Sequence, residues 1–166
     1  MHRWAKVSTA VLAACVVAAS DASAQSANIN VTATVFQAIA VTGARALDFG
    51  NVFPGVNKTI GTSAATSGRF DATGQAGANL NMTFTLPTDL AFGVNNLPIG
   101  SWTGCADADN DPTSGCSVFT PSASASGAAF SAGGALFIFI GGTVSPAANQ
   151  PAGTYTATAT LTLAYF

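Results

Sequence analysis

The last part of the chain, residues 154–166, alternates apolar and polar side chains. Successive side chains of a β-strand point to opposite faces, so this pattern predicts a strand that buries one face and leaves the other polar. One face carries Tyr155, Ala157, Ala159, Leu161, Leu163 and Tyr165. The other face carries threonine up to Thr162. No stretch of residues 25–166 combines three-and-four apolar spacing with intervening charges, so we expect an all-β fold without helices.

The same period of two recurs earlier in the chain, most clearly in residues 28–35 and 79–86. Shorter candidate strands are separated by Gly, Pro and Asn, which favour turns. They are Ala46 to Val52, Lys58 to Ile60, Gly68 to Ala72, Ala91 to Val94 and Leu136 to Ile140. Without helices to connect parallel neighbours, these strands predict an antiparallel β-sandwich, with a closed β-barrel as the alternative.

The candidate strand Leu136 to Ile140 consists of five consecutive apolar residues, Leu-Phe-Ile-Phe-Ile. A strand of this kind presents bulky side chains on both faces, and an uncovered one is prone to aggregate. Something must therefore cover both faces, either from the same chain or from another.

The first 24 residues have the organisation of a signal peptide, with a basic start, an apolar run over residues 7–19, and Ala22-Ser23-Ala24 as a cleavage site. We therefore expect an exported protein whose single domain spans residues 25–166, located in the periplasm, at the cell surface or outside the cell. Cys15 ends a Leu-Ala-Ala-Cys sequence that fits a bacterial lipidation site, an alternative opposed by the apolar run continuing beyond it. No later segment has the ~18 apolar residues of a transmembrane helix.

The residues that follow the signal peptide exclude several classes of function. They contain no histidine and no glutamate, and their only bases are Arg45, Lys58 and Arg69. A Ser-His-Asp mechanism and a histidine-ligated zinc site cannot be built from them, and no basic patch could meet a nucleic acid. The remaining acids outside one loop are scattered singly beside turn residues. We therefore expect neither an enzyme nor a nucleic-acid-binding protein, and no resident cofactor.

The exception is the loop between Cys105 and Cys116, which contains Asp107, Asp109 and Asp111. In an exported chain these two cysteines are expected to form a disulfide. The aspartates occupy the first, third and fifth positions of a calcium loop, but Pro112 and Val118 stand where an EF-hand has glycine and glutamate. The loop is thus predicted to be a solvated, disulfide-closed hairpin tip, with a weak calcium site as the alternative.

Both ends of the exported chain have the pattern of strands that pair. In residues 25–35 the apolar side chains Ile29, Val31 and Val35 alternate with polar ones, and the phase shifts at Phe36. This segment could be a donor that pairs with an exposed sheet edge of a neighbouring subunit, which would link subunits head to tail. The alternative is the first strand of a self-complete domain.

At the C-terminus the chain resembles the terminal motif of bacterial chaperone-usher pilins. The residues that carry this resemblance are Gly153, Tyr155, Leu161, Leu163, Tyr165 and Phe166. The wider sequence is similar to the bacterial family called domain of unknown function 4402, which includes pilin-like and spore coat U-like exported surface proteins. Its motifs are matched by residues 47–52, 70–74, 140–143 and 153–155.

The resemblance implies an immunoglobulin-like sandwich that serves as a structural subunit or adhesin-like component of a surface fibre or coat. It also implies assembly by donor-strand exchange, with identical or related subunits and a periplasmic chaperone as partners. The position of the predicted disulfide departs from the family, because pilins have theirs near the first strands. A self-complete secreted binding module, with weak calcium binding in the aspartate loop, is the alternative function.

Overall fold

The structure of the protein is a computed structural model that describes residues 24–166. The predicted signal peptide and Cys15 lie outside the described residues, apart from Ala24. Residues up to Thr34 and residues Val35–Phe166 form two separate units. Between residues 24 and 39 the chain forms neither helix nor strand, and residues 24–34 are exposed.

The second unit contains ten strands, and no helix occurs among residues 24–166. The strands are β1 (Ala40–Arg45), β2 (Lys58–Ile60), β3 (Gly68–Thr73), β4 (Asn79–Thr85), β5 (Asp89–Phe92), β6 (Asn95–Asp107), β7 (Ser117–Phe119), β8 (Ser126–Ala129), β9 (Ala135–Val144) and β10 (Thr160–Tyr165). Every strand pairing is antiparallel. The predicted all-β antiparallel fold is therefore confirmed.

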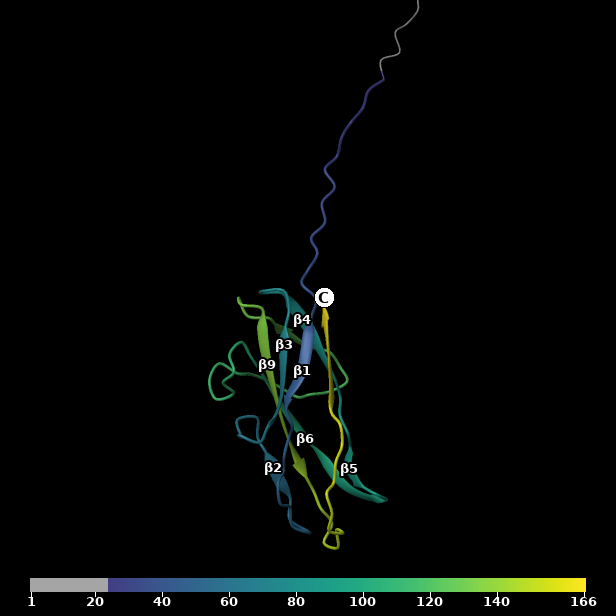
Figure 1. Cartoon of the computed structure of the whole chain (residues 1–166), viewed down its shortest axis with the longest axis vertical. Coiled ribbons are helices and arrows are strands. Elements are labelled where there is room, and N and C mark those ends of the chain that lie inside the picture. Colours follow the sequence, from purple (N-terminus) through teal and green to yellow (C-terminus); the bar gives the residue numbers. More distant parts are fainter. Residues whose placement is uncertain (1–23) are drawn as a thin grey trace, which may run out of the picture. The chain divides into compact units, whose positions relative to one another are not determined.

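The larger sheet has the strand order β1-β3-β9-β6-β5, with β2 also paired to β9 and β7 also paired to β6 (Figure 1). Its central strand β9 contains the apolar segment Leu136 to Ile140. Leu136, Ile138 and Ile140 point into the core. On the opposite face Phe139 is only 1% exposed, and the Arg45 guanidinium carbon lies 6.0 Å from the centre of its ring. The cover that this strand requires thus comes in part from its own chain.

The smaller sheet has the order β10-β4-β8 and packs face to face against the larger one. Strand β4 buries Leu80, Met82 and Phe84, and β10 contributes Leu161. These side chains meet the inward residues of β3 and β9 in one apolar cluster. The alternation seen in the sequence of β4 and β10 is therefore the pattern by which one sheet face enters the core.

A second cluster of buried residues lies in the half of the sandwich that contains β2 and β5. It consists of Phe49, Leu97, Ile99 and Val144. Trp102 packs against both clusters. A bulge in β6 positions it, because two residues, Ser101 and Trp102, stand opposite Gly142 alone, and Ser101 adopts a φ of 47°. The two clusters are thus joined at one aromatic side chain.

Two predicted strands are absent. Residues 46–52 form a loop, because the Asp48 carboxylate accepts a hydrogen bond from the Gly50 amide at 2.7 Å and Gly50 has a φ of 56°, which turns the chain. Residues 28–35 alternate as a strand would, but no neighbouring strand pairs with them within the described chain. Alternation indicates which side chains can share a face, whereas a strand also needs a partner for its backbone.

Candidate functional site

Two sheet edges that lack a partner lie side by side in the sandwich. Strand β1 pairs only with β3, and β10 pairs only with β4. Figure 1 shows β1 beside the yellow C-terminal strand. An open edge presents a row of unpaired backbone N–H and C=O groups that can accept another strand.

An apolar groove of about 330 Å³ lies between these edges, and we call it the edge groove. Gly43 and Arg45 of β1 line one side, and residues 157–159, which lead into β10, line the other. Its floor is formed by core residues of both clusters, namely Leu47, Phe49, Phe70, Leu90, Ile99, Trp102 and Ile140. The apolar core is therefore reachable from outside along the line where the sandwich is open.

Tyr165 closes the sandwich at the end where the C-terminus lies. Its hydroxyl accepts a hydrogen bond from the backbone amide of Gln75 and donates one to the backbone carbonyl of Gln37, both at 2.7 Å. Its ring contacts Phe36 edge-on, with 5.4 Å between ring centres, and Phe130 at 6.1 Å. The start of the second unit is thereby attached to the end of β10.

Of the other predicted assembly residues, Leu161 and Leu163 lie in β10, whereas Gly153 and Tyr155 precede it and Phe166 follows it. The strand predicted over residues 154–166 is thus confirmed only for Thr160–Tyr165, and before it Thr156 forms a single bridge with Ala91. Leu161 is buried, Leu163 is partly buried and Phe166 is 75% exposed. Gly153 lies against the Phe92 ring so closely that a Cβ atom would collide with it. Tyr155 packs against the same ring, with 5.7 Å between centres. A C-terminal glycine followed by alternating residues thus has a local steric reason in this fold.

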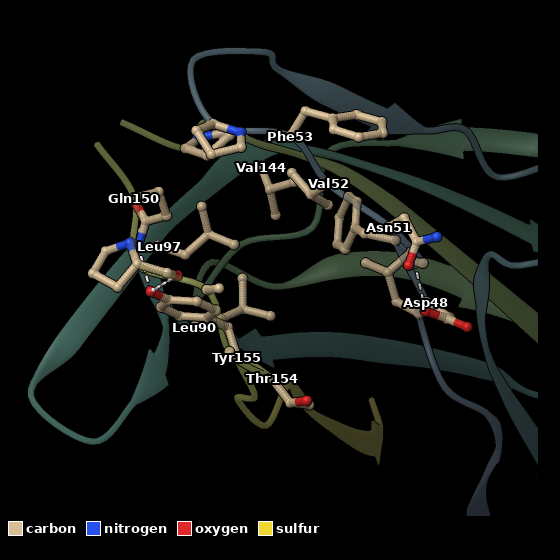
Figure 2. Close-up of a pocket in the computed structure, with 18 residues that line it drawn as sticks. Asp48, Asn51, Val52, Phe53, Leu90, Leu97, Val144, Gln150, Thr154 and Tyr155 are labelled. Carbon is tan, nitrogen blue, oxygen red and sulfur yellow. Dashed lines mark hydrogen bonds between the residues drawn. The ribbon is translucent and has the colours of Figure 1, made fainter. Parts of the chain in front are cut away.

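A larger cavity of about 590 Å³ opens at the opposite end of the sandwich (Figure 2), and we call it the terminal pocket. It is bounded by residues 47–54, by Leu90, Leu97 and Val144, and by the loop that contains residues 150–155. Leu47, Phe49 and Leu90 line both the terminal pocket and the edge groove. These three side chains therefore form a wall that the two hollows share.

Hydrogen bonds within the protein hold two polar residues of the terminal pocket, Gln150 and Tyr155. The Gln150 amide donates to the Asn96 carbonyl at 3.1 Å and to the Tyr155 hydroxyl at 2.8 Å. The Tyr155 hydroxyl in turn donates to the Pro151 carbonyl at 2.8 Å. These bonds hold the loop as one wall of the pocket. Asp48, Asn51 and Thr154 also line the pocket, so its lining combines polar groups with aliphatic and aromatic ones. This pocket was not predicted, because residues 46–52, most of which line it, were expected to form a strand.

The predicted donor residues Ile29, Val31 and Val35 are almost fully exposed. Apolar side chains in a row with no cover are unusual on a stable surface and mark a segment that interacts. The structure brings none of them to a partner within the described chain.

The predicted disulfide between Cys105 and Cys116 is present, with 5.5 Å between the Cα atoms. Cys105 lies in β6 and is fully buried, whereas Cys116 immediately precedes β7. The bond therefore closes the loop between two paired strands. It stands at the far side of the larger sheet from the β1 edge.

The three aspartates of this loop have different environments. Asp107 is only 6% exposed; its Oδ1 accepts from the Asp109 amide at 3.0 Å, while Oδ2 has no partner in the protein. The Asp111 carboxylate accepts from the Thr113 hydroxyl at 2.6 Å and from its amide at 2.9 Å, and these bonds lower the pKa of Asp111. No group of three acidic, histidine or cysteine side chains in residues 24–166 is arranged around a metal position. The weak calcium site stays a prediction.

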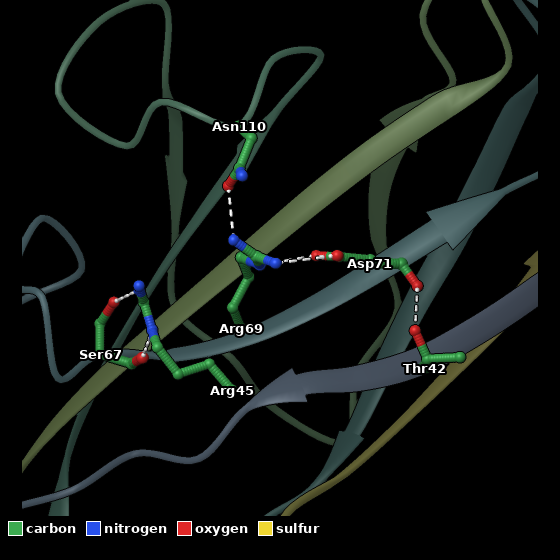
Figure 3. Close-up of polar contacts among 6 residues, drawn as sticks. All are labelled: Thr42, Arg45, Ser67, Arg69, Asp71 and Asn110. Atoms are coloured by element: carbon green, nitrogen blue, oxygen red, sulfur yellow. Dashed lines mark hydrogen bonds and ion pairs between the residues drawn. The ribbon is translucent and has the colours of Figure 1, made fainter.

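Two arginine side chains of the larger sheet make the polar contacts shown in Figure 3. Arg69 of β3 contacts the aspartate loop, and Arg45 of β1 contacts the residue that precedes β3. Arg69 forms an ion pair with Asp71, with Nε and Oδ1 2.7 Å apart, and donates to Asn110 at 2.9 Å. Arg45 donates to the carbonyl and hydroxyl oxygens of Ser67, both at 2.7 Å. Arg69 and Asp71 are two apart in β3, so their shared face could have been read from the sequence.

In comparisons with known proteins, no family model, no curated protein and no solved structure matches this chain. Within residues 24–166 there is also no helix of the length and apolarity that a membrane crossing requires.

Proposed function

We propose that the protein is an exported structural subunit, or an adhesin-like component, of a bacterial surface fibre or coat that assembles by strand donation. The observation that carries this proposal is a complementary pair of features in one chain. Residues 25–35 have a strand pattern without a strand partner, and the edge groove has two unpaired edges over an accessible core. Residues 25–35 of one copy could therefore provide the strand that the two edges of the groove in another copy lack.

The donated segment and the last part of the chain match in length and phase. Residues 25–35 are as long as the stretch Tyr155 to Tyr165, and both are apolar at odd-numbered positions from residue 29 onward. Paired antiparallel with Val31 opposite Ala159, the segment places Ile29 opposite Leu161 and Val35 opposite Tyr155. Residues directly opposite in an antiparallel pair share a face, so all of these side chains would point into the groove.

The direction of the donated strand depends on where the folded domain of the donor subunit, its body, must lie. Strand β10 runs toward the end that holds Tyr165 (Figure 1). An antiparallel donor runs the other way, so its residue 35 emerges near the terminal pocket, and the donor's body continues from there. A parallel donor would return its body to the end already held by Tyr165 and Phe36. Antiparallel donation thus produces a head-to-tail chain of subunits.

An open groove over an apolar core needs a temporary cover before assembly. A periplasmic chaperone that offers its own strand to β10 would provide one, and identical or related subunits would then replace it. We accordingly place the protein in the periplasm first and at the cell surface after assembly.

The proposal is tested with the full chain, produced in a bacterium with a periplasm and recovered from the cell surface. Val31→Asp places a charge on the inward face of the donor, whereas Thr32→Asp places the same charge on its outward face and serves as the matched control. We expect wild type and Thr32→Asp to form ladders of detergent-resistant multimers in unheated gels, and Val31→Asp to remain monomeric. A wild-type chain that is a stable monomer would instead favour the self-complete binding module.

A further inference from the structure

Bulky apolar side chains that remain exposed on the second unit gather at its two ends. Phe53 lines the terminal pocket, and Phe92 packs against its lining residues Gly153 and Tyr155. Val56 follows the lining residues 47–54 in the chain, and Val94 lies in the turn between β5 and β6. Phe36 and Phe166 lie at the other end, beside Tyr165. Six of the nine such residues in this unit are therefore at the ends, and the other three are Val35 of the predicted donor segment, Val41 and Val118. This distribution indicates that the two ends are contact surfaces.

Apolar side chains, among them Leu90, Leu97 and Val144, make up one part of the terminal pocket, and Asp48, Asn51 and Thr154 add polar groups to its lining. In the apolar part, the Gln150 side-chain amide and the Tyr155 hydroxyl donate their hydrogen bonds within the protein, so an apolar side chain can pack there without displacing a partner. The pocket volume of about 590 Å³ is ample for an aromatic side chain. A buried aromatic anchor in such a pocket is the usual centre of a protein–protein contact.

We propose that the terminal pocket of one copy receives Phe36 of the next copy; this inference rests on the proposed function. The antiparallel donor ends at Val35 beside Tyr155, which lines the terminal pocket. Phe36 directly follows Val35, so no additional length of chain is needed to bring its side chain to the pocket. Leu47, Phe49 and Leu90 line both the groove and the pocket, so the two hollows adjoin at these side chains.

Phe36 is already oriented for this contact in the single copy. One side of its ring packs on Tyr165, and the side chain as a whole remains 50% exposed. The exposed half can enter the neighbour's pocket while the other half stays on its own subunit. Phe36 then contacts both subunits, so that the folded domains are linked in addition to the contact made by the donated strand. The alternation of apolar and polar residues changes phase at Phe36, which marks the end of the inserted segment.

The test uses the full chain with benzoyl-phenylalanine, a photo-crosslinking amino acid, at Phe36 or, separately, at Val31. Copies labelled with heavy and light nitrogen are mixed during assembly, irradiated and digested, so that mass spectrometry separates crosslinks between copies from those within one. We expect position 36 to crosslink to peptides containing Phe53 or residues 150–155 of another copy. Position 31 should crosslink to residues 43–45 or 157–159 of another copy.

A pocket-blocking variant, Thr154→Trp, sharpens this test because Thr154 is exposed and lines the pocket. It should remove the crosslink from position 36 and leave that from position 31. Phe36→Ala should make the assembled multimers dissociate in detergent roughly thirtyfold faster, as expected for an aromatic anchor, whereas Val118→Ala should not.

The two proposals fail in different ways. Crosslinks from position 31 into the groove of another copy, together with crosslinks from position 36 outside the terminal pocket, would overturn the pocket assignment and leave strand donation intact. The same holds if Thr154→Trp leaves the position-36 crosslink unchanged. Absence of any crosslink between copies from either position would overturn both.

Discussion

Tyr165 shows how one side chain can hold both ends of a domain. Its hydroxyl bridges the Gln75 amide and the Gln37 carbonyl, and its ring packs on Phe36 and Phe130. The sequence resemblance marked this residue as part of an assembly strand. The structure adds a role within the single copy that the sequence could not reveal, since Gln37 and Tyr165 are 128 residues apart.

Removing the Tyr165 hydroxyl should therefore destabilise the fold. Tyr165→Phe keeps the ring but leaves the Gln75 amide and the Gln37 carbonyl without this partner. We expect the free energy of unfolding to fall by about 1–2 kcal/mol, measured by denaturant titration at unchanged slope. Phe166→Leu, which alters the exposed neighbour, should have little effect, and equal losses in the two variants would contradict this role of the hydroxyl.

Asp111 provides a prediction for pH. Because the Thr113 hydroxyl and amide donate to its ionised carboxylate, the pKa of Asp111 lies below its value in an unfolded chain. These bonds are present above the unfolded pKa and are lost as the pH falls through the folded one. In a carboxyl titration followed by NMR, Thr113→Ala should move the pKa of Asp111 upward, whereas Ser114→Ala should not move it. An unchanged pKa in Thr113→Ala would mean that its hydroxyl does not stabilise the carboxylate in solution.

At the scale of elements, the disulfide joins β6 and β7 across the loop that contains the aspartates. Closing a loop with a sequence separation of 11 should stabilise the fold by about 3 kcal/mol on the chain-entropy model. We expect the Cys105→Ser, Cys116→Ser double variant to lose stability of this order in chemical denaturation while it retains the proposed strand donation, because the bond joins β6 and β7 and neither of these strands pairs with β1 or β10. Loss of multimers in a folded double variant would contradict that separation.

Elements could be predicted where their bounds depend on residues close in sequence, and could not where they depend on hydrogen bonds or on distant residues. The strand boundaries of β2, β3 and β4 were close to those expected, because alternation and flanking turn residues are local signals. Residues 46–52 were wrongly expected to form a strand because Asp48 competes for the backbone through its side chain. The terminal pocket was missed for a related reason: it is made of loops whose shape depends on hydrogen bonds between distant residues.

At the scale of the whole molecule, the sandwich forms its apolar core from its own residues, but two neighbouring sheet edges have no partner strand. Both apolar clusters form from residues within Val35–Phe166, while the β1 and β10 edges remain open. The sequence predicted strands that pair at both ends of the chain. It could not show that these two edges face each other, because that arrangement depends on pairings between strands far apart in sequence.

An excess of free donor peptide should therefore stop assembly. A synthetic peptide of residues 25–35 should occupy the edge groove of terminal subunits and shorten the multimers of the full chain, as seen in unheated gels. The same peptide with Val31→Asp is the control and should leave multimer length unchanged. Equal shortening by both peptides would mean that the effect does not depend on the inward face of the donor.

The bulge at Ser101 has one more consequence. It directs Trp102 to the floor of the edge groove, and the only other tryptophan of the chain, Trp4, belongs to the predicted signal peptide. Once that peptide is removed, the indole fluorescence of the protein comes from a single ring beside the proposed docking line. Arrival of a strand should displace water from this ring and shift its emission to shorter wavelength, so the protein contains its own optical reporter of the proposed polymerisation.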